Sequence, residues 1–333
     1  MRLRALACFL ALALLAAPLG AGAQQAGKRP RVGWLSGGGG RSVSEHLQSP
    51  EYKAFAGGLR ELGYVVGENV SVNIRLAAPD KVERYPDLAA QHVAEGVDVI
   101  FAANPYSLAA TTRATRTIPV VGLDLESDPV AQGWAVSLAR PGGNLTGFFL
   151  DIPEMSGKHV QFLKEVKPDL ARVAVLGDPR VNELQFRATE AAARDAGLAL
   201  ERLSVRSPNE IETAIAEAAH RRAGGLVVLT SPLSLATVSR ITDAAVRHRL
   251  PAICSFVPRF ADAGGLLAYG PDFPELYRRG GGYVGRILKG TKPGELPIQR
   301  PEKFLLVINL KAARALGLAV PQSLMLRADH IIQ

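Results

Sequence analysis

The segment Val97-Asp-Val-Ile-Phe-Ala-Ala-Asn-Pro-Tyr106 contains the pattern from which the fold follows. Its apolar residues at 97–102 are typical of a buried strand, and a helical pattern continues from Tyr106 to Thr115. Asn104 and Pro105 join the two: an asparagine accepts hydrogen bonds from free helical N–H groups, and a proline has no N–H to leave unpaired. The segment therefore predicts a helix that begins where a strand ends.

The same strand–helix unit recurs on both sides of this segment, which predicts parallel sheets with helices on both faces. Before residue 147 we expect strands at Arg31–Leu35, Val70–Leu76, Val97–Ala102 and Ile118–Leu123, and helices at Tyr52–Leu62, Tyr85–Glu95 and Tyr106–Thr115. After it we expect strands at Arg172–Leu176, Leu200–Val205, Leu226–Thr230 and Ala252–Ser255, and helices at Glu183–Ala196, Ile211–Ala219 and Leu235–His248.

A Gly- and Pro-containing passage, Arg140–Gly147, interrupts the alternation, so two similar α/β units joined there are the simplest account. The tail (strand Gly265–Tyr269, helix Leu276–Leu288 and strand Phe304–Ile308) has too few elements for a third core and must complete the earlier sheets. We therefore expect two doubly wound, Rossmann-like α/β lobes joined by a hinge that the chain crosses several times. Lobe 1 would comprise residues 24–147 plus about 267–292, and lobe 2 residues 148–266 plus about 293–333.

The first residues have the pattern of a secretory signal peptide spanning residues 1–23. Arg2 and Arg4 precede an apolar run from Ala5 to Leu19, and Ala21-Gly-Ala23 provides an A-x-A cleavage site. Cys8 lies inside the apolar run, so it cannot be the cysteine of a lipoprotein cleavage site. We expect a periplasmic product that is not anchored by lipid.

Composition excludes several classes of protein. Cleavage after residue 23 would leave Cys254 as the only cysteine, so no intramolecular disulfide could form. Losing Arg2 and Arg4 would lower the formal charge from +8 to +6, and the remaining basic residues are scattered. Scattered charge is typical of solvated helix faces, so we expect no nucleic-acid partner. We expect the protein to be a monomer.

Four strand ends repeat the same device, a capping residue followed by proline. These pairs are Asn104-Pro105, Asp128-Pro129, Asp178-Pro179 and Ser231-Pro232. In a doubly wound sheet, helix N-termini at the carboxyl ends of strands line the ligand crevice, where their N–H groups favour an anion. A single pair is more simply explained as a clean helix start, but two in each half favour a cleft.

Further residues are expected near the same cleft. Gly37–Gly40 fits neither a dinucleotide fingerprint nor a P-loop and is interpreted as a flexible rim, with Ser36 as a ligand contact. Arg259 sits between aromatic residues and could hold a carboxylate with paired hydrogen bonds. The predicted ligand contacts are Ser36, Asn104, Tyr106, Ser107, Asp128, Phe148, Asp178, Ser231, Phe256, Arg259 and Tyr269. The alternative for the aromatic residues is packing between the lobes.

Catalytic and metal-binding patterns are absent or weak in the sequence. The histidines show no H-x-x-x-H or H-E-x-x-H spacing, and no G-x-S-x-G motif occurs. Asp124, Glu126 and Asp128 could pair for acid–base work, but Asp128 is already explained as a cap. Cys254 is interpreted as a small buried hydrophobic residue. We therefore expect no enzyme activity, no metal and no cofactor.

Several motifs resemble those of the tryptophan/tyrosine-type group of ABC-transporter substrate-binding proteins. The most specific are Ser137-Leu-Ala-Arg-Pro-Gly-Gly-Asn-Leu-Thr-Gly147 and Ala263-Gly-Gly-Leu-Leu-Ala-Tyr-Gly270. The resemblance covers nearly all of the chain after residue 23 and implies the type I periplasmic binding protein fold. The chain departs from the family pattern at Asn104-Pro-Tyr106 and Asp178-Pro179. Both lie where ligand should bind, and the acid at Asp178 would favour a ligand with an amino group.

The resulting expectation is the periplasmic solute-binding component of an ABC importer. Its lobes would close over a small carboxylate-bearing ligand, such as an amino acid or aromatic acid, and an inner-membrane permease would recognise the closed form. A sensory subunit that presents the same ligand to a membrane receptor is the alternative. An enzyme and a sugar-sensing repressor share the fold type, but export and the absence of a DNA-binding headpiece argue against the repressor.

Overall fold

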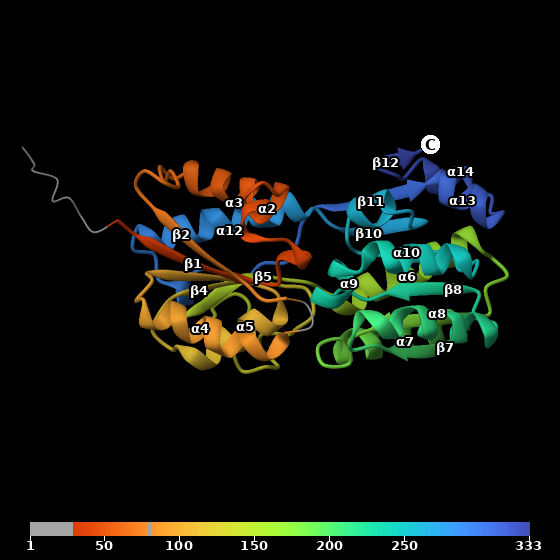
Figure 1. Ribbon diagram of the computed structural model, residues 1–333, viewed down its shortest axis with the longest axis horizontal. Helices are drawn as coiled ribbons and strands as arrows, with labels where there is room; N and C mark the ends of the chain where they lie inside the picture. The colour runs from red at the N-terminus through yellow and green to blue at the C-terminus, as the bar shows by residue number, and fades with distance from the viewer. Residues whose placement is uncertain (1–28, 79–80) are drawn as a thin grey trace, which may run out of the picture.

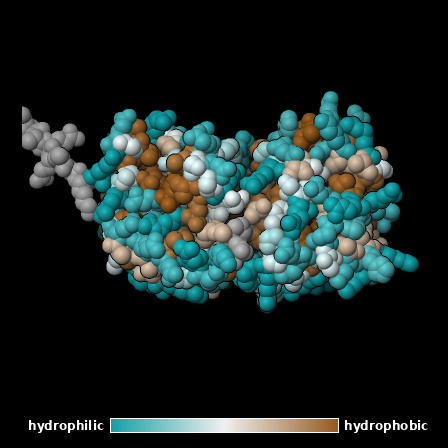
Figure 2. Space-filling view, in the orientation of Figure 1, coloured by the Kyte–Doolittle hydropathy of each residue, from teal (hydrophilic) through white to brown (hydrophobic). Residues whose placement is uncertain are grey.

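The computed structural model describes residues 29–78 and 81–333 and contains two α/β lobes that lie side by side along the long axis of the molecule (Figure 1). The expected signal peptide, residues 1–23, lies outside the described residues. One lobe contains a five-stranded sheet and the other a seven-stranded sheet. Hydrophilic residues cover most of the face shown in Figure 2. The predicted pair of doubly wound α/β lobes is confirmed.

The first lobe has an entirely parallel sheet in the order β2-β1-β3-β4-β5, with helices on both faces. Its strands are β1 Arg31–Ser36, β2 Ser71–Leu76, β3 Val99–Ala103, β4 Val120–Asp124 and β5 Leu145–Phe149. Its helices are α2 Val43–Leu47, α3 Pro50–Arg60, α4 Tyr85–Ala94, α5 Pro105–Ala114 and α12 Phe273–Leu288, with 3-10 turns at Gly38–Gly40 (η1), Val82–Arg84 (η2) and Pro293–Glu295 (η4).

The second lobe has the strand order β12-β11-β10-β9-β8-β6-β7, in which only the β10–β11 pair is antiparallel. Its strands are β6 Arg172–Gly177, β7 Ala199–Ser204, β8 Gly225–Val228, β9 Ala252–Cys254, β10 Leu267–Pro271, β11 Phe304–Asn309 and β12 His330–Ile332. Its helices are α6 Ile152–Val166, α7 Glu183–Asp195, α8 Ile211–His220, α9 Pro232–Ala236, α10 Val238–Arg247, α11 Arg259–Asp262, α13 Leu310–Leu316 and α14 Gln322–Met325, with a 3-10 turn at Pro208–Glu210 (η3).

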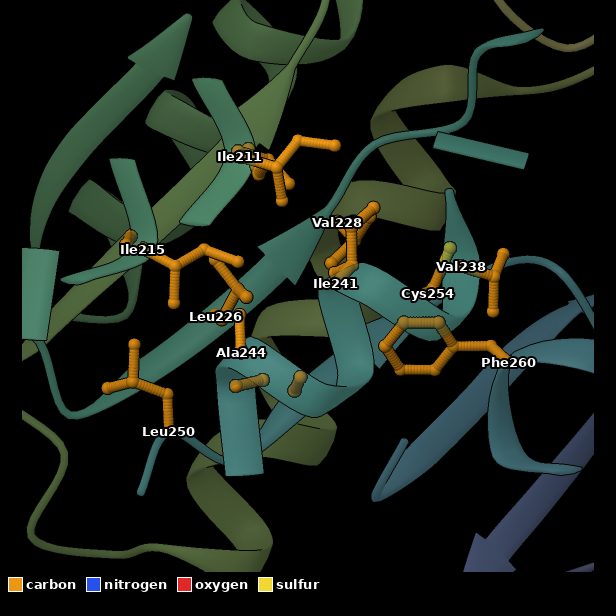
Figure 3. Close-up of a cluster of buried hydrophobic side chains, with 14 of the residues drawn as sticks. Ile211, Ile215, Leu226, Val228, Val238, Ile241, Ala244, Leu250, Cys254 and Phe260 are labelled. Carbon is orange, nitrogen blue, oxygen red and sulfur yellow. The ribbon is translucent and has the colours of Figure 1, made fainter. Parts of the chain in front are cut away.

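Apolar side chains from helices and strands interlock in the core of the second lobe (Figure 3). Ile211 and Ile215 of α8 and Ile241 of α10 are all fully buried in the same cluster as the strands. Cys254 lies in this cluster with no exposed surface, and burial raises the pKa of its thiol to about 12. Its interpretation as a small buried hydrophobic residue is therefore confirmed.

Two glycines allow α3 and α12 to touch through their backbones in the first lobe. A Cβ on Gly58 would lie 1.9 Å from the carbonyl oxygen of Arg278, and one on Gly281 would lie 2.1 Å from that of Phe55. No real side chain tolerates such distances. A segment more than 200 residues away in the chain thus completes the first lobe by direct helix-to-helix contact.

The chain passes between the lobes three times, after β5, after β10 and between η4 and β11. Phe149 N–H donates to the Gln299 carbonyl at 3.0 Å and Gln299 N–H to the Gly147 carbonyl at 2.9 Å, so the first and third crossings are paired. Lys303 bridges to Asp272 at 2.8 Å and ties the third crossing to the second. The multi-crossover hinge of the prediction is present.

The crossings do not lie where the sequence analysis put them. β5 still belongs to the first sheet through Phe149, and residues 267–271 form β10 of the second sheet, so the boundaries at 147 and about 267 are wrong by a few residues. The third boundary, about 293, falls before the η4 turn and Gln299, which contact the first lobe. The glycines of residues 140–147 made the start of β5 look like a connection, whereas Gly147 allows close strand contact: a Cβ on it would lie 1.9 Å from the Gly122 carbonyl.

The sequence pattern did not predict helix α6. Pro153 and Gly157 obscured its helical pattern, yet Pro153 occupies the first turn, where a missing N–H costs nothing. Asp151 caps the helix by accepting from Glu154 N–H at 3.5 Å.

Candidate functional site

A cavity of about 500 Å³ lies between the two lobes, which is the usual size for a small-molecule site. From the first lobe it is lined by the Gly37–Gly39 loop, His46, the start of α3, Asn104 and the end of β4. From the second lobe it is lined by the start of α9 and the turn at 256–262. Residues 273, 274 and 277 of α12 complete the wall beside the second crossing.

The lobes touch on more than one side of the cavity, so the cleft is closed. Tyr106 of α5 donates its hydroxyl to Asp178 of the second lobe at 2.9 Å. The Gln185 side-chain amide donates to the Leu125 carbonyl at 3.0 Å. The η1 turn packs against α9. These contacts join groups that would separate if the lobes opened.

The η1 turn requires its glycines. Gly38, Gly39 and Gly40 have φ of 60°, 62° and 80°, a region that L-residues rarely adopt. A Cβ on Gly39 would also lie 3.2 Å from Nη1 of Arg259 and 3.5 Å from Leu235. The glycine run predicted as a flexible rim thus forms a tight cover over the cavity.

Arg259 carries an unsatisfied positive charge at the cavity. It begins α11, lines the cavity, and its Nη1 is buried without a hydrogen-bond partner among the described residues. Burial, reinforced by the charge of Arg41, lowers the pKa of the Arg259 guanidinium. Arg41 itself is paired with Glu51 at 3.3 Å. A buried guanidinium nitrogen without a partner is costly unless an anion reaches it.

Two carboxyl groups lie at the end of β4 on the opposite lobe. Glu126 lines the cavity and is 6% exposed, and Asp124 is fully buried. Asp124 Oδ1 accepts from the N–H groups of Glu126 and Ser127 at 2.8 and 3.2 Å, while its Oδ2 has no partner within the described ranges. Burial, and then repulsion from Asp124, raises the pKa of Glu126 well above its usual value. A cation between the lobes would relieve this cost.

Aromatic rings from both lobes line the cavity. Tyr277 lines the cavity and stacks on Trp34 with ring centroids 5.6 Å apart. His46 lines the same wall and meets Trp34 edge-on at 4.9 Å. Phe256 and Phe273 approach each other at 5.9 Å, and both line the cavity. The cavity therefore combines charged groups with apolar walls suited to a flat ligand group.

Five of the predicted ligand contacts line the cavity: Ser36, Asn104, Ser231, Phe256 and Arg259. The hydroxyl of Ser36 accepts from Trp34 Nε1 at 3.0 Å. Asn104 and Ser231 cap their helices, accepting from Ser107 N–H at 2.8 Å and Ser234 N–H at 3.1 Å. The polar groups of these three residues thus hold the walls in place.

The other six predicted contacts do not line the cavity. Tyr106 and Asp178 bond to each other across the lobes, and Asp178 also binds Arg180 at 2.7 Å, so its acid is already neutralised. Ser107 is fully buried and donates its hydroxyl to the Asn104 carbonyl at 2.8 Å. Asp128 accepts from Val130 and Ala131 N–H groups at 2.9 and 3.1 Å, in a turn that no helix follows.

The two remaining predicted aromatic contacts, Phe148 and Tyr269, lie on strands that pack inside single lobes. Phe148 is fully buried in the first core, with Tyr283 at 4.9 Å and the Arg279 guanidinium 5.0 Å above its ring. Tyr269 packs in the second lobe between Phe162 at 4.9 Å and Phe304 at 5.8 Å. Both rings therefore fit the alternative interpretation, packing, better than ligand contact, although they pack within a lobe rather than between the lobes.

Sequence reasoning missed Glu126, His46, Tyr277 and Glu51 as cavity residues. Glu126 was noticed only for acid–base work, although its place directly after a buried strand was a usable signal. His46 lies on α2, a helix that the sequence did not predict, and Tyr277 lies in the C-terminal part of the chain. No local pattern indicates that α12 returns to the cleft.

Neither a metal cluster nor a membrane-crossing helix is found in residues 29–78 and 81–333. No three His, Cys, Asp or Glu side chains of these residues are grouped to hold a metal ion. None of the helices in these ranges is both long and apolar enough to cross a membrane.

Two lobes closed over a charged and aromatic cavity define a cleft-type solute-binding protein. Residues 43–332 match the family of ABC transporter substrate binding proteins, and the chain belongs to that family. It is therefore the substrate-binding component of an ABC import system, a family that binds and delivers small molecules rather than converting them, and its members are typically found outside the cytoplasm.

Several known proteins are similar to the chain. A tyrosine-binding protein of Clostridioides difficile (strain R20291) is 24% identical over 284 residues, covering 83% of this chain and 80% of the relative. A Streptococcus pneumonia ABC domain solved in complex with L-Trp has a TM-score of 0.82 at 24% identity, covering 92% of this chain and all of that one. A conserved domain protein of Vibrio cholerae has a TM-score of 0.82 at 23% identity, covering 91% and 100%. These structural similarities establish the fold.

Proposed function

We propose that the cavity binds a zwitterionic α-amino acid with an aromatic side chain. The observation that carries this proposal is a buried polar atom without a hydrogen-bond partner on each lobe, within the described part of the chain: Arg259 Nη1 on one, and Asp124 Oδ2 on the other, with the cavity-lining Glu126 beside it. A carboxylate would pair with Arg259 and an ammonium with the acids. Since each lobe supplies one half of the grip, the ligand binds tightly only when the lobes are closed.

The aromatic walls and the relatives support the nature of the side chain. Tyr277 and Phe256 both line the same cavity. The curated relative from Clostridioides difficile is a tyrosine-binding protein, and the Streptococcus structure holds L-Trp. The sequence expectation of a small carboxylate-bearing ligand is thereby refined to an amino acid, with the amino group met by Asp124 and Glu126 instead of Asp178.

We further infer a periplasmic, monomeric protein that delivers its ligand to an inner-membrane permease and binds no nucleic acid. Residues 1–23 would be removed on export, and no lipid would be attached because Cys8 is lost with them. Family membership favours delivery to a permease over presentation to a sensory receptor.

The test is calorimetry on residues 24–333 with three matched compounds: L-tryptophan, tryptamine without the carboxylate, and indole-3-propionate without the ammonium. L-tryptophan should bind most tightly. Arg259→Gln should weaken L-tryptophan about 10- to 100-fold, as expected for a charge-assisted bond, and should change tryptamine little. Arg194→Gln, at an exposed position on α7, is the matched control. Equal affinity for all three compounds, or an unchanged affinity in Arg259→Gln, would refute the proposal.

A further inference from the structure

His46 is a buried polar residue that the two-charge grip leaves without a role. It belongs to α2, which begins at Ser42 with a capping box completed by Glu45. Val43 and Leu47 on the same helix are exposed, 44% and 38%, whereas His46 is only 4% exposed. The short helix thus presents two apolar residues to solvent and buries its histidine, the reverse of ordinary patterning.

Both ring nitrogens of His46 lack a hydrogen-bond partner among the described residues, and both are buried. Buried polar atoms are almost always paired, so this orphaned pair requires an explanation. Burial, followed by the charge of Arg41, lowers the pKa of His46 to about 4, so the imidazole is neutral at pH 7. A neutral imidazole donates through one nitrogen and accepts through the other.

The position of His46 matches one end of the cavity. Its ring lines the cavity, lies edge-on to Trp34 and is 6.0 Å from Tyr52. Ser36, Asn104 and Ser231 already accept hydrogen bonds from other groups of the protein, as described above. Arg259 and the acids account for the two charges of an amino acid. His46 is therefore a neutral polar group at the cavity whose two ring nitrogens are both free to meet the rest of the ligand.

We propose that His46 hydrogen-bonds the N–H or O–H on the aromatic side chain of the bound amino acid and so determines specificity for it. This inference rests on the proposed function. A ring without such a group, as in phenylalanine, leaves both buried nitrogens unpaired. Sites built to bond a polar ligand group reject the analogue that lacks it more strongly than apolar pockets reject a missing methylene.

The test compares ligands that differ in one donor, by calorimetry on residues 24–333 at pH 7. L-tyrosine is paired with L-phenylalanine, and L-tryptophan with 1-methyl-L-tryptophan. One analogue is smaller than its parent and the other larger, while both lack the donor, so a uniform preference for larger or for smaller ligands cannot produce the same result twice. Wild-type protein should prefer the donor in both pairs by about tenfold.

Variants assign that preference to His46. His46→Phe should bind both members of each pair within about twofold, whereas His46→Gln, which can still bond, should retain part of the preference. His220→Phe makes the same substitution at an exposed position of α8 and should behave as wild type. Equal binding of the paired ligands by wild-type protein, or an undiminished preference in His46→Phe, overturns the inference alone. Binding of none of the four amino acids overturns the proposed function with it.

Discussion

Tyr106→Phe tests whether contacts between the lobes contribute to ligand affinity. The Tyr106 hydroxyl lies 2.9 Å from Asp178 Oδ2, a carboxylate whose side chain is 1% exposed. A hydrogen bond to a charged group contributes about 1.5–3 kcal/mol. Arg180 keeps three contacts to the same carboxylate, at 2.7, 2.9 and 3.1 Å, so the substitution leaves no unpaired acid. The lower end of the range therefore applies, about 1.5 kcal/mol or tenfold in affinity.

Because this bond joins the lobes, it is formed in the closed state and its loss should appear in ligand affinity. Calorimetry with L-tryptophan should show an affinity about tenfold lower than wild type, with the melting temperature of the ligand-free protein nearly unchanged. Tyr64→Phe, on a tyrosine that packs against the core of the first lobe, is the control. If Tyr106→Phe binds as tightly as Tyr64→Phe, the reasoning that closure is linked to binding through this bond is refuted.

Three further predictions concern the acids and the glycines. Burial keeps the pKa of Glu126 raised, so the folded state holds a proton that the unfolded state has lost above pH 4.5, and the stability of the protein should fall as pH rises through that window. Glu126→Gln should remove this fall, raise the ligand-free melting temperature at pH 7 by about 2 °C, and weaken the binding of L-tryptophan. A variant whose melting temperature depends on pH as steeply as that of the wild type would contradict this. Gly39→Ala should weaken binding about tenfold because left-handed backbone costs alanine about 1–2 kcal/mol and its methyl group meets Arg259. Gly157→Ala, whose added methyl group would have nothing within 4 Å, should leave binding unchanged. Titration of both variants with L-tryptophan tests this difference. Gly281→Ala should lower the melting temperature by several degrees, since overpacking costs about 1–3 kcal/mol. Gly282 has nothing within 4 Å of an added Cβ, so Gly282→Ala should leave the melting temperature equal or higher. A Gly281→Ala protein as stable as the wild type would exclude the α3–α12 contact.

The fold was largely predictable because its signals are local. Each strand end with Asn104-Pro105 or Ser231-Pro232 does begin a helix, and both helices open at the cavity. Asp128 and Asp178 are also followed by proline, but each caps a turn rather than a helix. The pattern indicates only that the aspartate accepts from a nearby free N–H, and it does not determine whether a helix follows. Strand β5 was taken for a connection because Gly147 serves close backbone contact rather than a turn, and β10 was predicted as a strand but assigned to the wrong lobe.

The site was predictable only in part because it is built from distant segments. Arg259 was recognisable as a cation among aromatic residues, and the structure places it at the cavity. Phe148 and Tyr269 carried the same aromatic signal, but the side of a strand on which a ring lies decides between cavity and core. His46 and Tyr277 had no local signal, since their role depends on α2 and α12 meeting Trp34.

The central claim is that one amino acid bridges the charges of the two lobes, and a crystal structure of residues 24–333 with L-tryptophan tests it most directly. The account predicts the ligand carboxylate within hydrogen-bond distance of Arg259 Nη1, the ammonium at Glu126 and Asp124, and the indole ring against Tyr277 with its N–H at His46. A ligand bound outside the cavity between the lobes, or one whose carboxylate does not contact Arg259, would contradict it.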